Sequence, residues 1–331
     1  MAEQRPLAEE LDEAPWAGGR CRRFEHRAMA TVFELWAFGP GARDVDQAAM
    51  AVFELIDQLE QELSYFIPCS DVSRINRLKA GESVRVGAAA FECIELARRV
   101  HAWTGGAFDP TVGAMLTGRR PWDEQERAQA HDASEHDGDA GGPVHVGMSL
   151  VETNRRWMAV GVLTDHVAID LGGIGKGYAL DEAGAMLRDW GIESVMLSAG
   201  RSTMLPIGLP PGGGAWTMRL IDPRDERTEL GRFDVEEGAV SVSAASAGAP
   251  HILNPSTGEP ALSRLGAWAW ARSAARADAL STAFMVMPTG EISGAARAAG
   301  GCAMLLSESE GDRLSLEAFG VWKRLCCGLG G

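Results

Sequence analysis

The sequence predicts an α+β, or mixed α/β, fold. Three observations predict it: some segments repeat apolar residues at helical spacing, others alternate apolar and polar residues, and the strand-like segments occur in consecutive pairs as well as around helices. With 331 residues and 46% hydrophobic content, the chain can bury a core of one large or two modest domains. No internal repeat is visible in the sequence.

The first half of the chain predicts a strand followed by two helices. Residues 1–25 are expected to form a disordered lead, and the composition of "TVFELWAF" predicts a strand at Thr31–Phe38. Apolar residues on one face predict a helix at Val45–Leu63, and a second helix is expected at Ala88–Thr104, where two glycines end it. Residues 117–144 are polar and low in complexity, which predicts an exposed insertion.

The second half predicts strands and helices in alternation. Two strands around a turn are expected at Trp157–Asp170, and a helix follows at Tyr178–Trp190. Another helix is expected at Asp278–Met287. The remaining predicted strands are residues 194–200, 215–223, 238–246, 301–310 and 314–322.

Charge and cysteine usage argue against several classes of protein. The formal net charge is −15 and no basic patch is present, which disfavours a nucleic-acid partner. The six cysteines are scattered without CxxC spacing, as in proteins that keep free thiols. No transmembrane segment, signal peptide or lipid-attachment motif is readable, so the sequence predicts a cytoplasmic protein. One domain is expected over residues 26–325, followed by a tail at residues 326–331.

A single carboxylate stands out in the apolar stretch "ADALSTAFMVM". Asp278 and Thr282 are four positions apart, so on a helix they share one face. Two oxygen ligands so placed suit a hard cation such as Mg²⁺. The alternative is that Asp278 is the N-cap of this helix and that Thr282 bonds back to its own backbone.

The densest cluster of glycines is "DLGGIGKGYALDEAGAMLRDWG", which joins a strand to a helix. Glycines allow a ligand to approach the backbone, a helix N-terminus offers free N–H groups to an anion, and Lys176 favours phosphate. The P-loop pattern fails because Asp170 holds its first glycine position and Gly177 stands where Ser or Thr is needed. The Rossmann spacing of glycines fails too. A merely tight turn is the alternative.

Three further segments could carry chemistry. In "TGGAFDPTVG", Asp109 could bond the N–H face of a purine or flavin ring, or the amides of its own turn. His251 in "PHILNPSTGEP" could be a catalytic base or a structural histidine. Tyr65 and Phe66, in "LSYFIPCSDVSRIN", could stack on an aromatic ring or pack on each other.

Taken in order, these segments resemble the ApbE family, the FAD:protein FMN transferases. The family pattern includes G-G-A-F-D-P-T-V-G, D-L-G-G-I-A-K-G-Y, H-I-x-D-P-x-T-G and A-D-A-L-A-T-A. The segments that carry the resemblance are Met29–Thr31, Ser64–Asn76, Gly105–Gly113, Asp170–Tyr178, His251–Gly258 and Ala277–Ala283. They span about residues 27–320, and the fold that the resemblance implies has antiparallel sheets flanked by helices.

The resemblance implies Mg²⁺-dependent transfer of FMN from FAD to a threonine hydroxyl of an acceptor protein, with release of AMP. It assigns Mg²⁺ to Asp278, Thr282 and the carbonyl group of Gly173, and the catalytic base to His251. The phosphates of FAD would contact Lys176. The rest of FAD would contact Met29, Tyr65, Phe66, Asp109 and Ile252.

The chain departs from the family pattern on the acceptor side. "SAGRST" replaces N-A-G-G-D, so Arg201 and Ser202 stand for Gly and Asp, and the stretch before His251 is short. Asn254 and Ser256 replace a usual Asp and a common Arg. Two alternatives follow: an FAD pyrophosphatase that transfers to water, and a non-catalytic flavin-binding paralogue.

Overall fold

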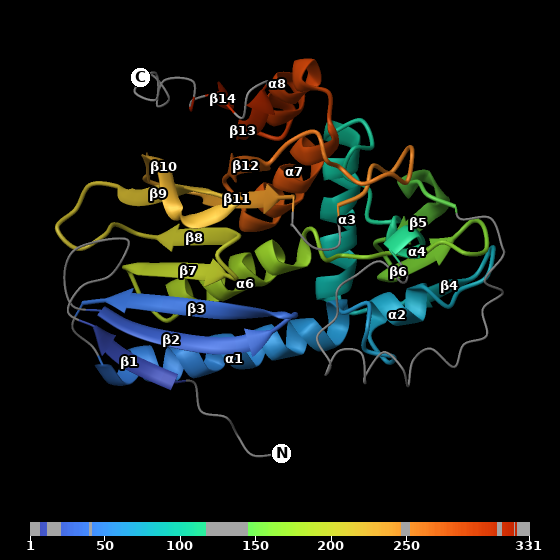
Figure 1. Cartoon of the computed structure of the whole chain (residues 1–331). Helices are drawn as coiled ribbons and strands as arrows, with labels where there is room; N and C mark the ends of the chain where they lie inside the picture. Colours follow the sequence, from blue (N-terminus) through green and yellow to red (C-terminus); the bar gives the residue numbers. More distant parts are fainter. Residues whose placement is uncertain are drawn as a thin grey trace.

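A nine-stranded antiparallel sheet forms the centre of the molecule (Figure 1). The computed structural model describes residues 7–11, 21–39, 42–116, 145–245, 252–309, 313–320 and 322. The strand order is β1-β2-β3-β7-β8-β11-β12-β13-β14, and every neighbouring pair runs antiparallel. The strands are β1 (Leu7–Leu11), β2 (Cys21–Ala28), β3 (Thr31–Phe38), β7 (Val195–Ala199), β8 (Thr203–Ile207), β11 (Ala239–Ala244), β12 (Gly266–Ala271), β13 (Cys302–Ser309) and β14 (Arg313–Phe319).

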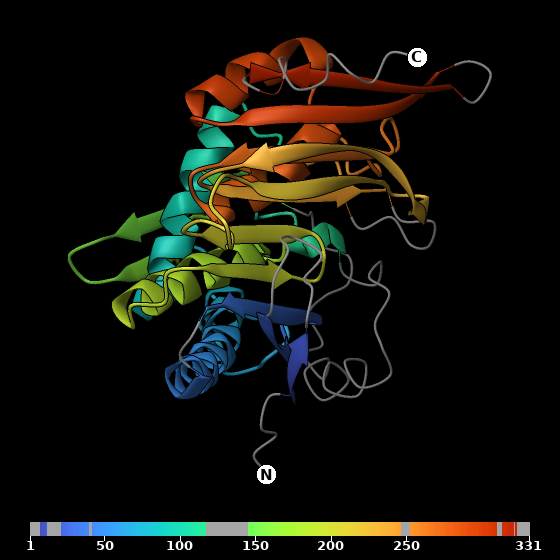
Figure 2. The same cartoon turned by 90° about the vertical axis from the view of Figure 1, so that its left-hand side faces the viewer.

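Helices pack on one face of this sheet, and small residues let them approach it closely (Figure 2). These helices are α1 (Ala42–Leu63), α6 (Gly175–Asp189), α7 (Ala274–Val286) and α8 (Thr289–Ala298), and α3 (Ala88–Trp103) packs against α1, α7 and α8. Strand β12 turns Ala267, Ala269 and Ala271 toward the helices and Trp268 to the opposite face, as the two-residue strand period requires. Alanine-rich α7 packs on β11 and β12 and is buried almost all round.

The other face of the sheet is partly covered by a hairpin of β9 (Trp216–Asp222) and β10 (Asp225–Val235). Trp216, which is fully buried, packs there in a second hydrophobic core with Trp36 and Trp268 of the large sheet. A separate three-stranded sheet joins β4 (Ser83–Arg85), β6 (Ala159–Val162) and β5 (Val151–Asn154). The short helices α2 (Asp71–Ile75) and α4 (Gly113–Leu116) complete the described elements, with one 3₁₀ turn at Met148–Leu150.

The mixed α+β class is confirmed, and helices occur where the sequence predicts them. The predicted bounds differ at the starts, since α6 begins at Gly175 and α7 at Ala274. The pair of strands expected at Trp157–Asp170 is wrong, because β6 ends at Val162 and its partner β5 precedes the predicted segment. Sequence reasoning also missed β10, β12 and α8.

The N-terminal lead differs from expectation as well. Residues 1–25 were predicted to be disordered, but β1 lies in this range and pairs with β2, which begins at Cys21. The predicted insertion at residues 117–144 and the tail at 326–331 lie outside the described residues. Among the described residues, no helix combines the length and the apolar character that a membrane span requires.

Candidate functional site

One large cleft, of about 1270 Å³, opens where turns and helix ends meet the central sheet. Its walls come from the β2–β3 turn, the end of α1, residues 107–112, residues 170–176, the β7–β8 turn, β11 and α7. Its volume exceeds the range of about 300–1,000 Å³ typical of small-molecule pockets. The cleft is therefore roomy enough for a ligand of dinucleotide size.

The structure brings nine of the ten predicted site residues to this cleft. Its lining includes Met29, Tyr65, Phe66, Asp109, Gly173, Lys176, Ile252, Asp278 and Thr282. The tenth, His251, lies outside the described residues, although the next residue along the chain lines the cleft. Residues from 29 to 282 in the sequence thus share one surface, which is what a common ligand would require.

Asp278 is not a helix cap. Helix α7 begins at Ala274, and its N-cap is Ser273, whose side chain accepts a hydrogen bond from the Arg276 amide. Asp278 lies in the second turn, so the N-cap interpretation of this residue is wrong. The other half of that alternative holds, since the Thr282 hydroxyl donates to the carbonyl oxygen of Asp278 over 3.3 Å.

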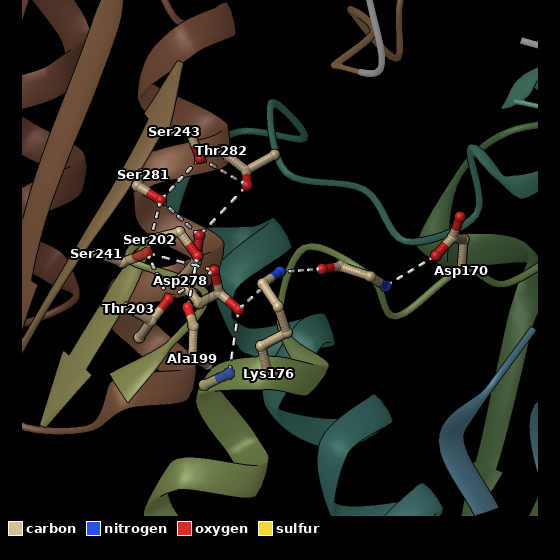
Figure 3. A network of polar contacts seen from close by, with 12 residues as sticks. Asp170, Lys176, Ala199, Ser202, Thr203, Ser241, Ser243, Asp278, Ser281 and Thr282 are labelled. Carbon is tan, nitrogen blue, oxygen red and sulfur yellow. Dashed lines mark hydrogen bonds and ion pairs between the residues drawn. The ribbon is translucent and has the colours of Figure 1, made fainter. Parts of the chain in front are cut away.

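The Asp278 carboxylate is only 4% exposed, and its two oxygens have different surroundings (Figure 3). Oδ1 accepts hydrogen bonds from the hydroxyls of Thr203 and Ser241, each over 3.3 Å. Oδ2 accepts one from the Gly177 amide over 3.1 Å and lies 3.6 Å from Nζ of Lys176. The carboxylate is thus buried and held in one orientation by groups from α6, β8 and β11.

Two glycines near Lys176, Gly173 and Gly177, lie close to helix α7. A Cβ on Gly177 would lie 2.3 Å from the Ala274 carbonyl oxygen, so only glycine lets α6 cross the start of α7 at this distance. A Cβ on Gly173 would lie 3.4 Å from Oγ1 of Thr282, so this backbone is close to the Thr282 hydroxyl. Gly177 therefore serves the crossing of two helices rather than a tight turn, and the loop at residues 170–176 lines the cleft.

A second carboxylate, Asp181 of α6, holds the start of α7 in place. Asp181 accepts hydrogen bonds from the Ser273 hydroxyl and from the Ala274 and Ala275 amides, over 2.7, 2.7 and 3.0 Å. Burial raises the pKa of Asp181, and these hydrogen bonds oppose that rise. The crossing of α6 and α7 thus sets where Asp278 and Lys176 lie relative to each other.

The donors near Asp278 fit a hard cation better than a soft one. They are a carboxylate, the Thr282 hydroxyl and the backbone of Gly173, all oxygen donors of the kind that Mg²⁺ prefers. Over the described part of the chain, no three His, Cys, Asp or Glu side chains gather as a zinc-type centre would need. The residues present therefore fit the predicted magnesium site.

Asp109 also lines the cleft, and both of its carboxylate oxygens have partners close by in the sequence. Its Oδ1 accepts from the amide and the hydroxyl of Thr111, over 2.9 and 2.6 Å. Its Oδ2 lies 3.3 Å from Nδ1 of His101, and this hydrogen bond raises the pKa of the histidine. Of the two predicted uses of Asp109, bonding within its own turn is the one that the structure contains.

Two aromatic side chains and a turn with positive φ angles also line the cleft. The rings of Tyr65 and Phe66 pack edge to face, with centroids 5.2 Å apart, and both side chains stay half-buried. Met29 and Ala30 both have positive φ angles, of 50° and 57°, in the β2–β3 turn. The Met29 amide donates to Oε1 of Glu60 over 2.6 Å, which ties this turn to α1.

Sequence reasoning missed the hydroxyl groups around Asp278. Ser243 is 2.9 Å from Ser281 and 3.3 Å from Thr282, oxygen to oxygen, and Ser281 donates to Ser241 over 3.3 Å. The signal was available in "AVSVSA", where Ser241 and Ser243 occupy alternate positions of a strand and so share its inner face. A polar side chain at such a position needs a buried partner.

Known proteins resemble this chain over most of its length. The ApbE family model matches residues 29–306, a range that contains all the predicted site residues. A Vibrio cholerae protein named FAD:protein FMN transferase is 25% identical, over 75% of this chain and 75% of its own. A Salmonella typhimurium protein of the same name is 24% identical, over 91% of this chain and 89% of its own. The crystal structure of the ApbE protein from Thermotoga maritima has a TM-score of 0.75 and 27% identity, covering 92% of this chain and 98% of its own.

Proposed function

Because the chain belongs to the ApbE family, we propose that it is an FAD:protein FMN transferase. It would move FMN from FAD to a threonine hydroxyl of an acceptor protein and release AMP, with Mg²⁺ as the divalent cation. The observation that carries the proposal is the gathering of the predicted residues on one cleft of about 1270 Å³. A dinucleotide substrate needs a site of this size.

In this reaction the acceptor hydroxyl oxygen bonds to the phosphorus of the FMN half of FAD. The bond between that phosphorus and the bridging oxygen breaks, and AMP leaves with the oxygen. The proton of the hydroxyl passes to a base, which we propose is His251. Lys176, whose ammonium group lies beside Asp278 in the cleft, would contact the phosphates.

We propose that Asp278, Thr282 and the Gly173 carbonyl group hold the cation. When bound, Mg²⁺ would neutralise charge on the phosphate oxygens of FAD. The support for this assignment is the buried carboxylate of Asp278, whose Oδ2 lies beside the cleft-lining Lys176. The Thr282 hydroxyl is one helical turn away on the same helix, and the Gly173 backbone lies against it.

The other predicted residues would bind the remainder of FAD. Tyr65 and Phe66 offer ring faces and edges at the cleft wall, and Met29 and Ile252 add apolar surface. Both oxygens of Asp109 already have partners, Oδ1 in Thr111 and Oδ2 in His101, so Asp109 would meet the ligand as an additional acceptor.

One observation favours keeping a second candidate function, an FAD pyrophosphatase. The β7–β8 turn lines the cleft, and in it Arg201 takes a φ of +56° at a position where the family pattern has glycine. The long, charged side chain of Arg201 changes the part of the cleft wall that an acceptor segment would contact. If it blocks the acceptor, water would take its place and AMP would still be released.

A single assay separates these functions. The purified protein is incubated with FAD, MgCl₂ and a threonine-containing acceptor domain, and the products are read by intact mass and by chromatography of AMP. An FMN adduct on the acceptor together with AMP is the expected result. AMP without adduct would indicate the pyrophosphatase, and bound FAD with neither product would indicate a flavin-binding paralogue without catalytic activity.

The role of His251 has its own test within this assay. His251→Ala is expected to slow FMN transfer by a factor on the order of 10²–10⁴, the usual contribution of a positioned general base. FAD affinity should stay close to that of the wild type, because the base acts on the acceptor hydroxyl. Equal transfer rates for the two proteins at saturating FAD would remove His251 from the mechanism.

A further inference from the structure

We propose that Thr203 and Ser241 are positioning residues that make Asp278 a monodentate ligand, which offers the cation only one of its two carboxylate oxygens. They would thereby set the preference of the cleft for Mg²⁺ over Ca²⁺. The inference rests on the proposed metal site. It starts from the contrast between the two carboxylate oxygens: Oδ1 meets two buried hydroxyls, whereas Oδ2 lies beside Lys176 and the cleft (Figure 3).

The two hydroxyls are built into the interior. Thr203 and Ser241 are both fully buried, and their oxygens lie 2.9 Å apart. Ser281, also fully buried, lies 3.3 Å from the Ser241 hydroxyl and 2.9 Å from the Asp278 carbonyl oxygen, oxygen to oxygen, and can donate its one proton to either. Among the described residues, these two hydroxyls are the hydrogen-bond donors to Oδ1, and a buried carboxylate oxygen without a partner is costly.

The network also explains why two hydroxyls are present. Each hydroxyl carries one proton, and Thr203 and Ser241 are near enough to bond to each other as well as to Oδ1. If Ser241 donates to Thr203, Thr203 still donates to Oδ1, and the reverse also holds. If only one of the two hydroxyls is removed, the other can still donate to Oδ1. If both are removed, Oδ1 loses both donors.

The consequence for a bound cation follows from coordination chemistry. Ca²⁺ takes six to eight oxygen ligands and often uses both oxygens of a carboxylate, while Mg²⁺ demands an octahedral arrangement and keeps several waters. Holding Oδ1 in the interior withholds the second oxygen from the cleft. Freed from both hydroxyls, the carboxylate could turn and offer both oxygens, which helps Ca²⁺ and disturbs the placement that Mg²⁺ requires.

The test compares dissociation constants for Mg²⁺ and for Ca²⁺, measured by calorimetry with each metal alone. The double variant Thr203→Val with Ser241→Ala is expected to bind Mg²⁺ about 10- to 100-fold more weakly, the usual effect of removing groups that orient a metal ligand. Ca²⁺ affinity should fall far less, so the selectivity for Mg²⁺ drops by roughly tenfold or more. Each single variant should shift the ratio in the same direction by a smaller factor.

Thr153→Val is the matched control. This threonine also lies in a strand and donates its hydroxyl to a carboxylate, that of Glu95 over 2.7 Å, but it is not part of the cleft. Its removal should leave both dissociation constants unchanged. Thr203→Ser keeps the hydroxyl and should restore the wild-type ratio, which a loss of packing alone would not do.

The proposal is overturned if Mg²⁺ and Ca²⁺ affinities fall by the same factor, or if the ratio matches that of the Thr153→Val control. Should the double variant fail to fold, an unchanged ratio in both single variants would overturn it equally. AMP release by the wild type keeps the two proposals apart. Normal AMP release with an unchanged ratio removes only this inference, whereas a shifted ratio without AMP release removes the proposed function.

Discussion

Two buried carboxylates, Asp109 and Asp278, line the cleft, and they are held in different ways. Asp109 is satisfied by Thr111, two residues away, and by His101, eight residues away. Asp278 is satisfied by Gly177, Thr203 and Ser241, which are 101, 75 and 37 residues away. The first carboxylate stabilises a turn of its own chain segment, while the second depends on the whole arrangement of α6, α7 and the sheet.

This difference separates a residue that shapes the cleft from one that can act in it. Both oxygens of Asp109 already have partners within the protein, so replacing it should loosen the turn first. Asp278 has buried partners on Oδ1 but turns Oδ2 toward Lys176 and the cleft. We therefore expect changes around Asp278 to alter ligand binding, and changes around Asp109 to alter stability.

The largest effect on stability is expected at Gly177, where α6 crosses the start of α7. Gly177→Ala would place a Cβ 2.3 Å from the Ala274 carbonyl oxygen and should destabilise the fold by about 3 kcal/mol, as overpacking of a tight contact does. Gly175→Ala is the matched control, because its Cβ would meet only Cβ of Leu171, at 4.0 Å. It should stabilise the protein by about 0.5 kcal/mol.

Chemical denaturation of the two alanine variants checks this prediction. Equal stability of Gly177→Ala and Gly175→Ala would show that α6 and α7 tolerate separation at this point. In that case the crossing of the two helices would not be what fixes Asp278, and the contrast with the locally held Asp109 would weaken.

A smaller effect, on binding, is expected from Lys176→Met. Removing the ammonium group should weaken FAD binding by roughly 10- to 100-fold, the usual contribution of a hydrogen bond to a charged group. The same change removes the cation 3.6 Å from Oδ2 of Asp278, so Mg²⁺ alone should bind more tightly than to the wild type.

Lys79→Met serves as the control for Lys176→Met, since Lys79 is exposed and lies outside the cleft. Flavin fluorescence titrations and calorimetry with MgCl₂ supply the two constants. If Lys176→Met binds FAD and Mg²⁺ as Lys79→Met does, Lys176 contacts neither the phosphates nor the metal site.

The smallest effect concerns the locally held carboxylate and its pH dependence. The hydrogen bond to Asp109 is the main cause that raises the pKa of His101 in the folded protein. The stability from this contact is therefore fully present below the unfolded histidine pKa of about 6.5 and is lost as the pH rises through the folded value. The Tm difference between wild type and His101→Gln should accordingly shrink from pH 6 to pH 9.

Thermal scans at several pH values measure this difference. A Tm difference that grows with pH would contradict the sign of the pKa shift. The dissociation constant for Mg²⁺ should not show the pH dependence of this Tm difference, because His101 contacts Asp109 and not Asp278.

The sequence predicted the fold class and the helices because their periodic signals are local. It failed at Trp157–Asp170, where buried Val167 and Ile169 imitate a strand. The Asn76 side chain explains the error, since its amide group exchanges two hydrogen bonds with the Ile169 backbone, over 2.7 and 2.9 Å. The backbone of residues 110–113 also pairs with this segment, through one parallel bridge between Val112 and Ala168. Pairing with a side chain 93 residues away and with a single bridge leaves no periodic signal.

The site shows the same division between local and distant information. Motif resemblance identified the residues that line the cleft, including Asp278 and Lys176. It did not identify Thr203 or Ser241, because serine and threonine are ordinary in strands and their partner lies on a distant helix. The strand order that places β8 beside β11 is what brings these hydroxyls together, and that order is not readable from one sequence.

Mg²⁺ binding by wild type, Asp278→Asn and Asp109→Asn, measured by calorimetry under the same conditions, tests the contrast most directly. Both variants keep the size of the side chain, remove the carboxylate and turn one acceptor oxygen into an NH₂ donor. We predict that Asp278→Asn loses measurable Mg²⁺ binding and stays folded, while Asp109→Asn lowers the Tm and keeps a dissociation constant close to that of the wild type. Retained Mg²⁺ binding in Asp278→Asn, or its loss in a folded Asp109→Asn, would contradict the account.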